Sequence, residues 1–424
     1  MAEKSSETRP FIVGPIDEQN LLQRFKFNIN KCYYCGICEP LCPVFTPLFA
    51  LWDREVEKGE RLNLEDFRPV VDLCYYCKLC LLTCGIGVDL PRLMLESKVF
   101  YVQRHGQTLQ NQLLMNTDLV GQLNGLVPPL ANLALTNPIS RRLMEAIVGV
   151  DRRRTFPKVP SQPFPRWYRR HAARRNPPST ANGRKVALFS GCYTDHFDPE
   201  VGIAATLVLE HNGVEILYPE QRCCGIPKLA DGSLEAAREN FRYNLSRLAP
   251  LVRQGYEVVV ISPPCSMTFK QEYLDYLGGE EAELVARHVF DISQYLYRMH
   301  ERGELKTDFR PLPLKVAYHV PCAAKAQRIE RVALELLALI PELQVTLIDR
   351  GCCGFDGTFG FKKQFFDISM QVGKPLFEGI RQSGATHTAT DCPLCEVQIT
   401  DGTHTVTVHP IELLCQAYGY HKAR

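Results

Sequence analysis

The chain has 424 residues, of which 45% are hydrophobic, and its formal net charge is +2. A single core seldom exceeds about 250 to 300 residues, so we expect two or more domains. The composition excludes an intrinsically disordered chain. The first twenty residues lack the apolar segment of a secretory signal, and no run of eighteen apolar residues exists. We therefore expect neither an exported protein nor a membrane-spanning helix.

The chain contains eighteen cysteines. In a protein that is not exported, disulfide bonds are not expected, because the cytosol keeps thiols reduced. Thiolates bind soft metals, so the cysteines predict metal sites.

Two cysteine motifs of equal spacing lie in the first hundred residues. The first motif is "KCYYCGICEPLC" from Lys31, and the second motif is "LCYYCKLCLLTC" from Leu73. This spacing is typical of [4Fe-4S] sites, in which three cysteines hold one cluster and the fourth ligates its neighbour. The pattern predicts one [4Fe-4S] cluster on Cys32, Cys35, Cys38 and Cys84, and another on Cys74, Cys77, Cys80 and Cys42.

Zinc or disulfides are the alternatives for these eight cysteines. A structural zinc needs four thiolates and commonly separates its two pairs more widely, so it fits the spacing poorly. Pro43 follows the first motif, whereas Gly85 replaces the usual proline after the second. The tyrosines between the cysteines are expected to shield the clusters from water and so to tune their potentials.

Residues 48–73 predict a helix, a turn around Gly59 and a second helix. This arrangement resembles the helical ferredoxin domain of succinate dehydrogenase and heterodisulfide reductase iron-sulfur subunits. We therefore expect an N-terminal extension over 1–24 and a helical ferredoxin domain over 25–105.

Residues 106–183 predict amphipathic helices followed by a basic, proline-rich linker. From Leu109 to Val150 leucines recur at helical spacing, broken by Gly125 and two prolines. A helical hairpin here would either bind one membrane leaflet or cover the ferredoxin domain. Between Arg141 and Lys185 we count thirteen Lys or Arg residues against two acids. That stretch is expected to be an exposed, irregular connector.

The C-terminal side is duplicated. Cys322 follows Cys192 by 130 residues, Cys353 follows Cys224 by 129, and Cys395 follows Cys265 by 130. A constant period across three motifs indicates repeated domains, expected at 184–305 and 312–424. Each repeat alternates strand and helix, which favours a parallel α/β sheet with the cysteines at its carboxyl edge.

The repeats resemble the cysteine-rich CCG domain of the heterodisulfide reductases, found in their B subunit, because each has a lone Cys, a Cys-Cys-Gly and a later Cys. From Asn30 onward the chain resembles the C subunits of anaerobic glycerol-3-phosphate dehydrogenases. The stretches that carry this resemblance are "NTDLVGQLNGLVPPLAN", "DRRRTFP", "RWYRR", "PLPLKVAYHVPC" and "GFKK". The fold expected is a helical ferredoxin domain followed by two tandem α/β CCG domains.

The resemblance implies a noncubane [4Fe-4S] cluster in the second repeat, on Cys322, Cys352, Cys353, Cys392 and Cys395. The first repeat has four cysteines, with Ser262 where the fifth would stand. Those four, Cys192, Cys223, Cys224 and Cys265, could hold a cluster or a zinc, or could be vestiges of the duplication.

Two other residues have competing interpretations. His319 precedes Cys322 by three residues and could relay protons, or could be a hydrogen-bonded structural histidine. Cys415 lies among apolar helix residues and is expected to be buried packing. No nucleotide-binding or nucleophile motif occurs, so we expect no flavin on this chain.

The leading hypothesis is an electron-transfer subunit that links a flavoprotein dehydrogenase to membrane quinone. The resemblance implies glycerol 3-phosphate as the partner's substrate, although related subunits serve glycolate and lactate oxidation. The alternatives are a thiol-disulfide reductase and an iron-sulfur sensor or scaffold. We expect flavoprotein partners, quinone and peripheral membrane contact, no nucleic acid, and a cytoplasmic location on the inner face of the membrane.

Overall fold

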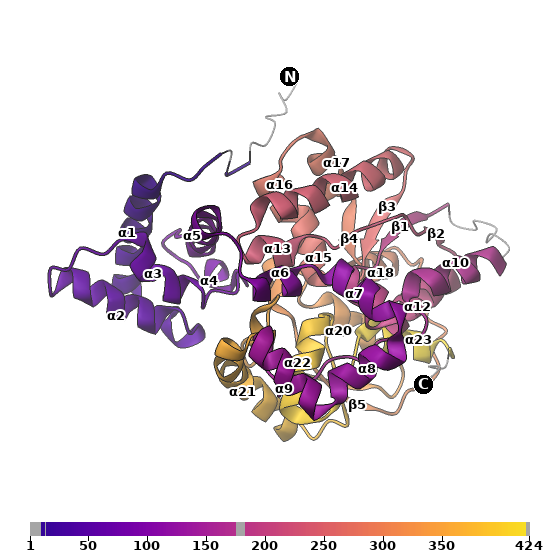
Figure 1. Ribbon diagram of the computed structural model, residues 1–424. Helices are drawn as coiled ribbons and strands as arrows, with labels where there is room; N and C mark the ends of the chain where they lie inside the picture. Colours follow the sequence, from indigo (N-terminus) through magenta and orange to yellow (C-terminus); the bar gives the residue numbers. More distant parts are fainter. Residues whose placement is uncertain (1–9, 13, 175–182, 421–424) are drawn as a thin grey trace.

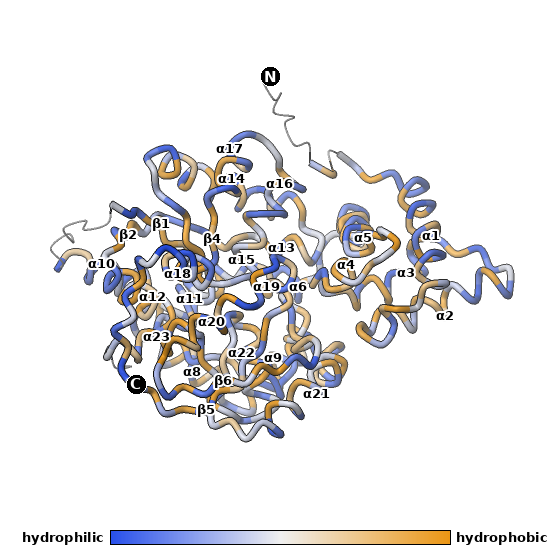
Figure 2. Tube along the Cα trace, turned by 180° about the vertical axis from the view of Figure 1, so that it is seen from behind, coloured by the Kyte–Doolittle hydropathy of each residue, from blue (hydrophilic) through white to orange (hydrophobic). Residues whose placement is uncertain are grey.

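The computed structural model describes residues 10–12, 14–174 and 183–420. The N-terminal part is helical and stands to one side of the two sheet domains in both views (Figures 1 and 2). Its elements are α1 (Glu18–Cys35), η1 (Glu39–Leu41), α2 (Phe45–Val56), α3 (Leu64–Val71), α4 (Leu79–Leu82) and α5 (Leu90–His105). The predicted helix, turn and helix around Gly59 is therefore confirmed by α2 and α3.

Caps and apolar spacing explain these helices. Asp17 caps α1 through the amides of Gln19 and Asn20, and Asn63 forms a capping box with Asp66 at the start of α3. Their apolar faces meet in one core, which includes Phe25 and Phe67 at ring-centroid distance 5.1 Å. Six of the eight motif cysteines pack against this core, so the helices hold the two motifs together.

Four short helices follow: α6 (Leu109–Met115), α7 (Thr117–Leu126), α8 (Pro128–Thr136) and α9 (Pro138–Ile147). They lie over the CCG part of the chain (Figure 1), and α7 packs against α11 (Cys192–His196). Their leucines do not cover the ferredoxin domain, so that alternative is wrong. Nine apolar side chains of α7 to α9 are 54% to 76% exposed and form what we term the apolar face: Leu119, Leu123, Leu126, Val127, Leu130, Leu133, Ile139, Leu143 and Ile147.

Each repeat forms a parallel sheet. In the first the strand order is β2-β1-β3-β4 and in the second β6-β5-β7-β8. The strands are β1 (Lys185–Phe189), β2 (Glu215–Leu217), β3 (Glu257–Val260), β4 (Val289–Asp291), β5 (Lys315–Tyr318), β6 (Gln344–Leu347), β7 (His387–Ala389) and β8 (Val406–Val408). The parallel α/β architecture is confirmed, and β4 and β8 add an edge strand that the three-strand pattern did not predict.

Helices cover both sheets, as the strand-helix alternation requires. In the first CCG domain they are α11, α12 (Pro199–His211), α13 (Ile226–Ala230), α14 (Leu234–Arg253), α15 (Pro263–Met267), a π-helical turn η2 (Thr268–Glu272), α16 (Tyr273–Tyr276), α17 (Glu280–His288) and α18 (Ile292–Glu301). In the second they are α19 (Cys322–Ala326), α20 (Val332–Leu337), η3 (Phe359–Phe361), η4 (Lys363–Phe365), α21 (Phe366–Gln382), α22 (Pro393–Thr403) and α23 (Pro410–Ala417).

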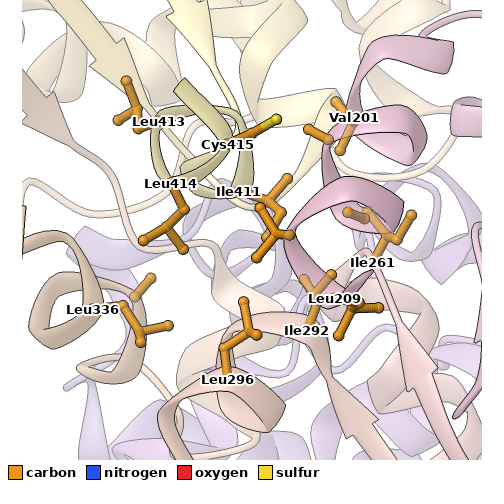
Figure 3. Close-up of a cluster of buried hydrophobic side chains, with 14 of the residues drawn as sticks. Val201, Leu209, Ile261, Ile292, Leu296, Leu336, Ile411, Leu413, Leu414 and Cys415 are labelled. Atoms are coloured by element: carbon orange, nitrogen blue, oxygen red, sulfur yellow. The ribbon is translucent and has the colours of Figure 1, made fainter. Parts of the chain in front are cut away.

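The two CCG domains share a core. Figure 3 shows Val201 and Leu209 of α12 beside Ile411 and Leu414 of α23, so side chains from the first and second repeats interdigitate. Cys415 lies in this core and is 7% exposed, which confirms its prediction as buried packing.

The basic connector is neither wholly exposed nor irregular. It includes the end of α9 and a further helix, α10 (Phe164–Arg174), and Phe164 is fully buried in the shared core. Arg154 is also buried, and its guanidinium pairs with Asp401 at 2.8 Å. The expectation failed because the charge pattern does not reveal acidic partners more than 200 residues away. Part of the predicted connector, 175–182, lies outside the described residues.

Candidate metal centres

All eighteen cysteines lie within the described residues, and none of them forms a disulfide bond there. Cys84 of the second motif lies beside the first motif. Burial raises the pKa of Cys32 to about 12, and the next largest cause is repulsion from Cys84. In addition, Thr83 Oγ1 lies 3.6 Å from Cys38 Sγ.

Cys42 shows the reciprocal arrangement. Burial raises its pKa to about 12, and repulsion from Cys74 contributes. The pKa of Cys80 is also raised, first by burial and then by Cys74 and Cys42. The fourth cysteine of each motif thus lies near the other motif, as a crossed ligand set requires. The assignment of ligands to clusters stays a prediction.

The two motifs have different surroundings. Tyr34 of the first motif is 79% exposed, whereas its counterpart Tyr76 is 6% exposed and Tyr75 is 7% exposed. Shielding by tyrosine is therefore wrong for Tyr34. The second motif is buried against the CCG domains, and the first motif remains at the surface.

Lys78 is a functional candidate that the sequence did not identify. It occupies the position of Gly36 in the first motif, and both residues are left-handed, with φ of 61° for Lys78 and 64° for Gly36. Left-handed backbone is costly for a lysine. Its ammonium forms a buried ion pair with Glu272 of η2, and Tyr76 Oη donates to the same carboxylate at 2.8 Å. These contacts hold the second motif against the first CCG domain.

The repeat-two site comprises the five cysteines predicted from the second repeat. They follow the carboxyl ends of β5, β6 and β7, as expected. Cys353 Sγ and Cys395 Sγ are 3.0 Å apart, and the amide of Gly354 donates to Cys352 Sγ at 3.3 Å. A Cβ on Gly354 would lie 2.3 Å from the carbonyl oxygen of Ser369, so the Cys-Cys-Gly turn requires glycine.

His319 lies at the repeat-two site. Ligand atoms of His319, Cys353 and Cys395 lie within 4.8 Å of one another. Its Nε2 is buried and has no hydrogen-bond partner among the described residues. A hydrogen-bonded structural histidine would need a partner at that atom. Burial lowers its pKa to about 4, so the imidazole is neutral at pH 7. A proton-relay role stays a prediction.

The repeat-one site comprises Cys192, Cys223, Cys224 and Cys265. Cys192 Sγ lies 3.6 Å from Cys223 Sγ, and Ser262, in place of a fifth cysteine, occupies the N-cap position of α15. The site has an acidic neighbour: Asp118 Oδ2 of α7 accepts a hydrogen bond from the Cys223 amide at 2.7 Å. Burial raises the pKa of Asp118 to about 6.

Asp118 was missed, although the sequence holds a signal for it. It is the one charged residue between 106 and 140, in a stretch whose other residues suggest an apolar surface. A lone carboxylate there needs a specific partner, and the fold supplies one from a loop more than 100 residues later.

The donor sets fit iron-sulfur clusters or another thiophilic metal. Burial raises the pKa of Cys32 and Cys42 above that of a free thiol. For Cys322 the hydrogen bond with Cys352 raises the pKa most, and burial adds to it. Buried thiolates therefore need a compensating positive charge, which a bound metal provides. At the repeat-two site His319 also offers a ring nitrogen within 4.8 Å of the sulfur atoms of Cys353 and Cys395, where a bound group could engage it.

Comparisons with known proteins identify the domains and the relatives of this chain. The model of the cysteine-rich CCG domain matches residues 186–270 and 316–400. The chain is 33% identical over 397 residues to the C subunit of anaerobic glycerol-3-phosphate dehydrogenase from Escherichia coli, covering 92% of this chain and 98% of that protein. It is 31% identical over 247 residues to the B subunit of fumarate reductase (CoM/CoB) from Methanothermobacter marburgensis, covering 56% of this chain and 47% of that protein.

A third relative matches about half of the chain. Lactate utilization protein A of an Exiguobacterium species is 28% identical over 239 residues, which is 54% of this chain and 94% of that protein. The resemblance drawn from the cysteine motifs is thus confirmed over nearly the whole chain. With two CCG domains behind a cysteine-rich helical domain, the protein belongs to the family of the C subunit of anaerobic glycerol-3-phosphate dehydrogenase.

Proposed function

We propose that this chain is an iron-sulfur electron-transfer subunit. It takes electrons from a flavin-containing dehydrogenase of the glycerol 3-phosphate type and delivers them to a membrane quinone. The observation that carries the proposal is a contact between the ferredoxin domain and the second CCG domain. Helix α4, which includes Cys80, packs against α19, which begins at Cys322. This contact supports a connected series of centres that runs from the second ferredoxin motif to the repeat-two site.

The exposure of the two motifs supports a direction. At the first motif, Tyr34, Ile37 and Leu41 are 79%, 59% and 58% exposed, so a partner can approach closely. At the second motif the tyrosines are buried. Iron-sulfur clusters, when bound, carry single electrons at potentials set by burial, charge and hydrogen bonds. We infer entry from the flavoprotein at the first motif and transfer inward.

Iron analysis of the anaerobically reconstituted chain tests the number of clusters. We expect at least eight irons, since two [4Fe-4S] clusters contain that number. Replacing Cys353 with Ala should abolish the repeat-two signal in electron paramagnetic resonance and leave the cubane signals. Four or fewer irons would contradict two cubanes, and an unchanged spectrum would remove the repeat-two site from the series.

A thiol-disulfide reductase is the second candidate, because one relative at 31% identity is named for a reaction with CoM and CoB. That function predicts turnover of a disulfide by the reduced chain without a flavoprotein. A subunit that only transfers electrons to quinone should not turn over a disulfide. The match to a lactate utilization protein makes lactate the first alternative substrate to test with the partner dehydrogenase.

We also propose that the apolar face docks on a membrane surface. Searched over 10–174 and 183–420, the helices include none with the length and hydropathy to cross a bilayer. The apolar face lies instead along short surface helices. Exposed Arg142 precedes Leu143 in α9, and exposed Arg152 follows the end of α9 by five residues. Apolar side chains beside cations are typical of surfaces that bind one leaflet with anionic headgroups.

Replacing Leu126 and Leu130 with Glu should weaken membrane binding more than tenfold, because each buried leucine contributes about 1.5–3 kcal/mol. Flotation with phosphatidylglycerol vesicles measures this. Val56→Glu is the matched control, since Val56 is 56% exposed on the ferredoxin domain, and it should bind like the parent chain. Absence of parent binding would contradict membrane docking.

A further inference from the structure

We propose that the repeat-one site is the exit of the electron-transfer series, that electrons reach it from the second motif through the repeat-two site, and that the quinone is reduced beside α7. This inference rests on the function proposed above and gives its centres an order. It requires iron at the repeat-one site, because zinc has no redox chemistry.

The second motif adjoins the repeat-two site. Besides the contact of α4 with α19, the ring of Tyr75 lies 4.7 Å from that of Phe359, which follows the Cys352–Cys353 turn by six residues. Tyr75 thus lies at the contact between the second motif and the segment that follows Cys353.

A second tyrosine fills the junction between the two CCG sites. Tyr193 directly follows Cys192 and packs against the core that contains Cys353, Cys392 and Cys395. Nearby, α15 contacts α19, and the Gln327 side chain donates to the Pro263 carbonyl at 3.0 Å. Close protein packing joins the two sites.

The duplication distinguishes entry from exit. Cys352 and Cys223 are equivalent residues of the two repeats. The segment after Cys352 contacts the second motif through Phe359 and Tyr75, whereas the amide of Cys223 donates a hydrogen bond to Asp118 of α7. Helix α7 therefore packs on the repeat-one site, as the second ferredoxin motif packs on the repeat-two site.

Helix α7 approaches the repeat-one site closely and also reaches the surface. A Cβ on Gly121 would lie 2.4 Å from the ring of His196, so only glycine permits this packing. Asp118 and Gly121 face the site, while Leu119, Leu123 and Leu126 belong to the exposed apolar face. The same helix thus connects the cysteines with the surface proposed to meet the membrane.

The overall reaction balances. The partner's reduced flavin loses two electrons, which pass singly through the chain, and releases two protons to the solvent. One quinone accepts both electrons and takes two protons from water to become quinol.

The test uses anaerobic holoprotein, reduced and then mixed with phosphatidylglycerol vesicles that contain menaquinone-4. The oxidation state of each centre is followed by rapid-freeze electron paramagnetic resonance. We expect Cys223→Ser to lose only the repeat-one iron and to be reoxidised at least tenfold more slowly. In Cys353→Ala, the cubanes should reduce the repeat-one centre more slowly than they do in the parent chain. Tyr193→Leu should retain all iron yet slow reoxidation, whereas Tyr297→Leu, on α18, should match the parent chain.

The midpoint potential of the repeat-one centre tests whether Asp118 is a positioning residue. Asp118→Asn should raise the midpoint potential of the repeat-one centre without loss of iron, because a negative charge beside the centre is removed. An unchanged potential would overturn the role of α7.

The remaining outcomes separate the two proposals. Zinc at the repeat-one site, or reoxidation of Cys223→Ser at the parent rate, would overturn the exit while leaving quinone reduction intact. If the repeat-one centre of Cys353→Ala is reduced at the parent rate, electrons pass to it directly from the second motif. That result would overturn the proposed order of the centres. Failure of the parent chain to reduce menaquinone-4 would instead contradict the proposed function.

Discussion

Replacing Lys78 with Met is expected to destabilise the junction between the ferredoxin domain and the first CCG domain by about 3–5 kcal/mol. The substitution leaves the Glu272 carboxylate, whose side chain is fully buried, without its cation. Methionine has the same left-handed backbone cost as lysine, so this change isolates the ion pair. Hydrogen–deuterium exchange of the anaerobic holoprotein, resolved by segment, measures the loss.

Two further variants make the experiment specific. Lys78→Met combined with Glu272→Met should recover much of the stability, because replacing both partners removes the unpaired buried charge. Lys58→Met is the control, since Lys58 lies exposed in the turn after α2, and it should change stability by less than about 0.5 kcal/mol. Equal protection in Lys78→Met and the parent chain would show that the pair does not hold the junction.

Replacing Arg154 with Ala is expected to cost about 3–5 kcal/mol in the second CCG domain. Its buried guanidinium donates to Asp401 at 2.8 Å, to Gln398 at 2.6 Å and to the Gly360 carbonyl at 2.9 Å, and it stacks on Phe355 at 4.6 Å. Phe355 follows the Cys-Cys-Gly turn, so the loss should also broaden the repeat-two spectroscopic signal.

The neighbouring Arg152 provides the matched control. Its side chain is 53% exposed, and its ion pair with Glu145 is 3.9 Å long, so Arg152→Ala should be nearly neutral. Thermal unfolding of the three anaerobic holoproteins compares them. Similar midpoints for both variants would contradict the anchoring role of Arg154.

The sequence predicted what depends on spacing. Cysteine intervals indicated two ferredoxin motifs, the constant period indicated a duplication, and the alternation of strands and helices indicated parallel sheets. The cysteine intervals and the alternation of strands and helices are local features, since helices and strands impose their periods on neighbouring residues. The duplication could be recognised because the same local motifs recur in order. The edge strands β4 and β8 were missed because three residues are too few to show a period.

Only the tertiary structure decided which distant groups meet. Lys78 and Glu272 are 194 residues apart, and Arg154 and Asp401 are 247 apart, so no local pattern links them. Asp118 reaches Cys223 because α7 packs on α11. Cysteine spacing by itself determined the chemistry that the ligands favour, because thiolate positions on a short loop are set by chain geometry. The order and the surroundings of the centres depend on long-range packing. Each of these contacts joins residues far apart in the chain, and no local sequence pattern indicates which residues will meet.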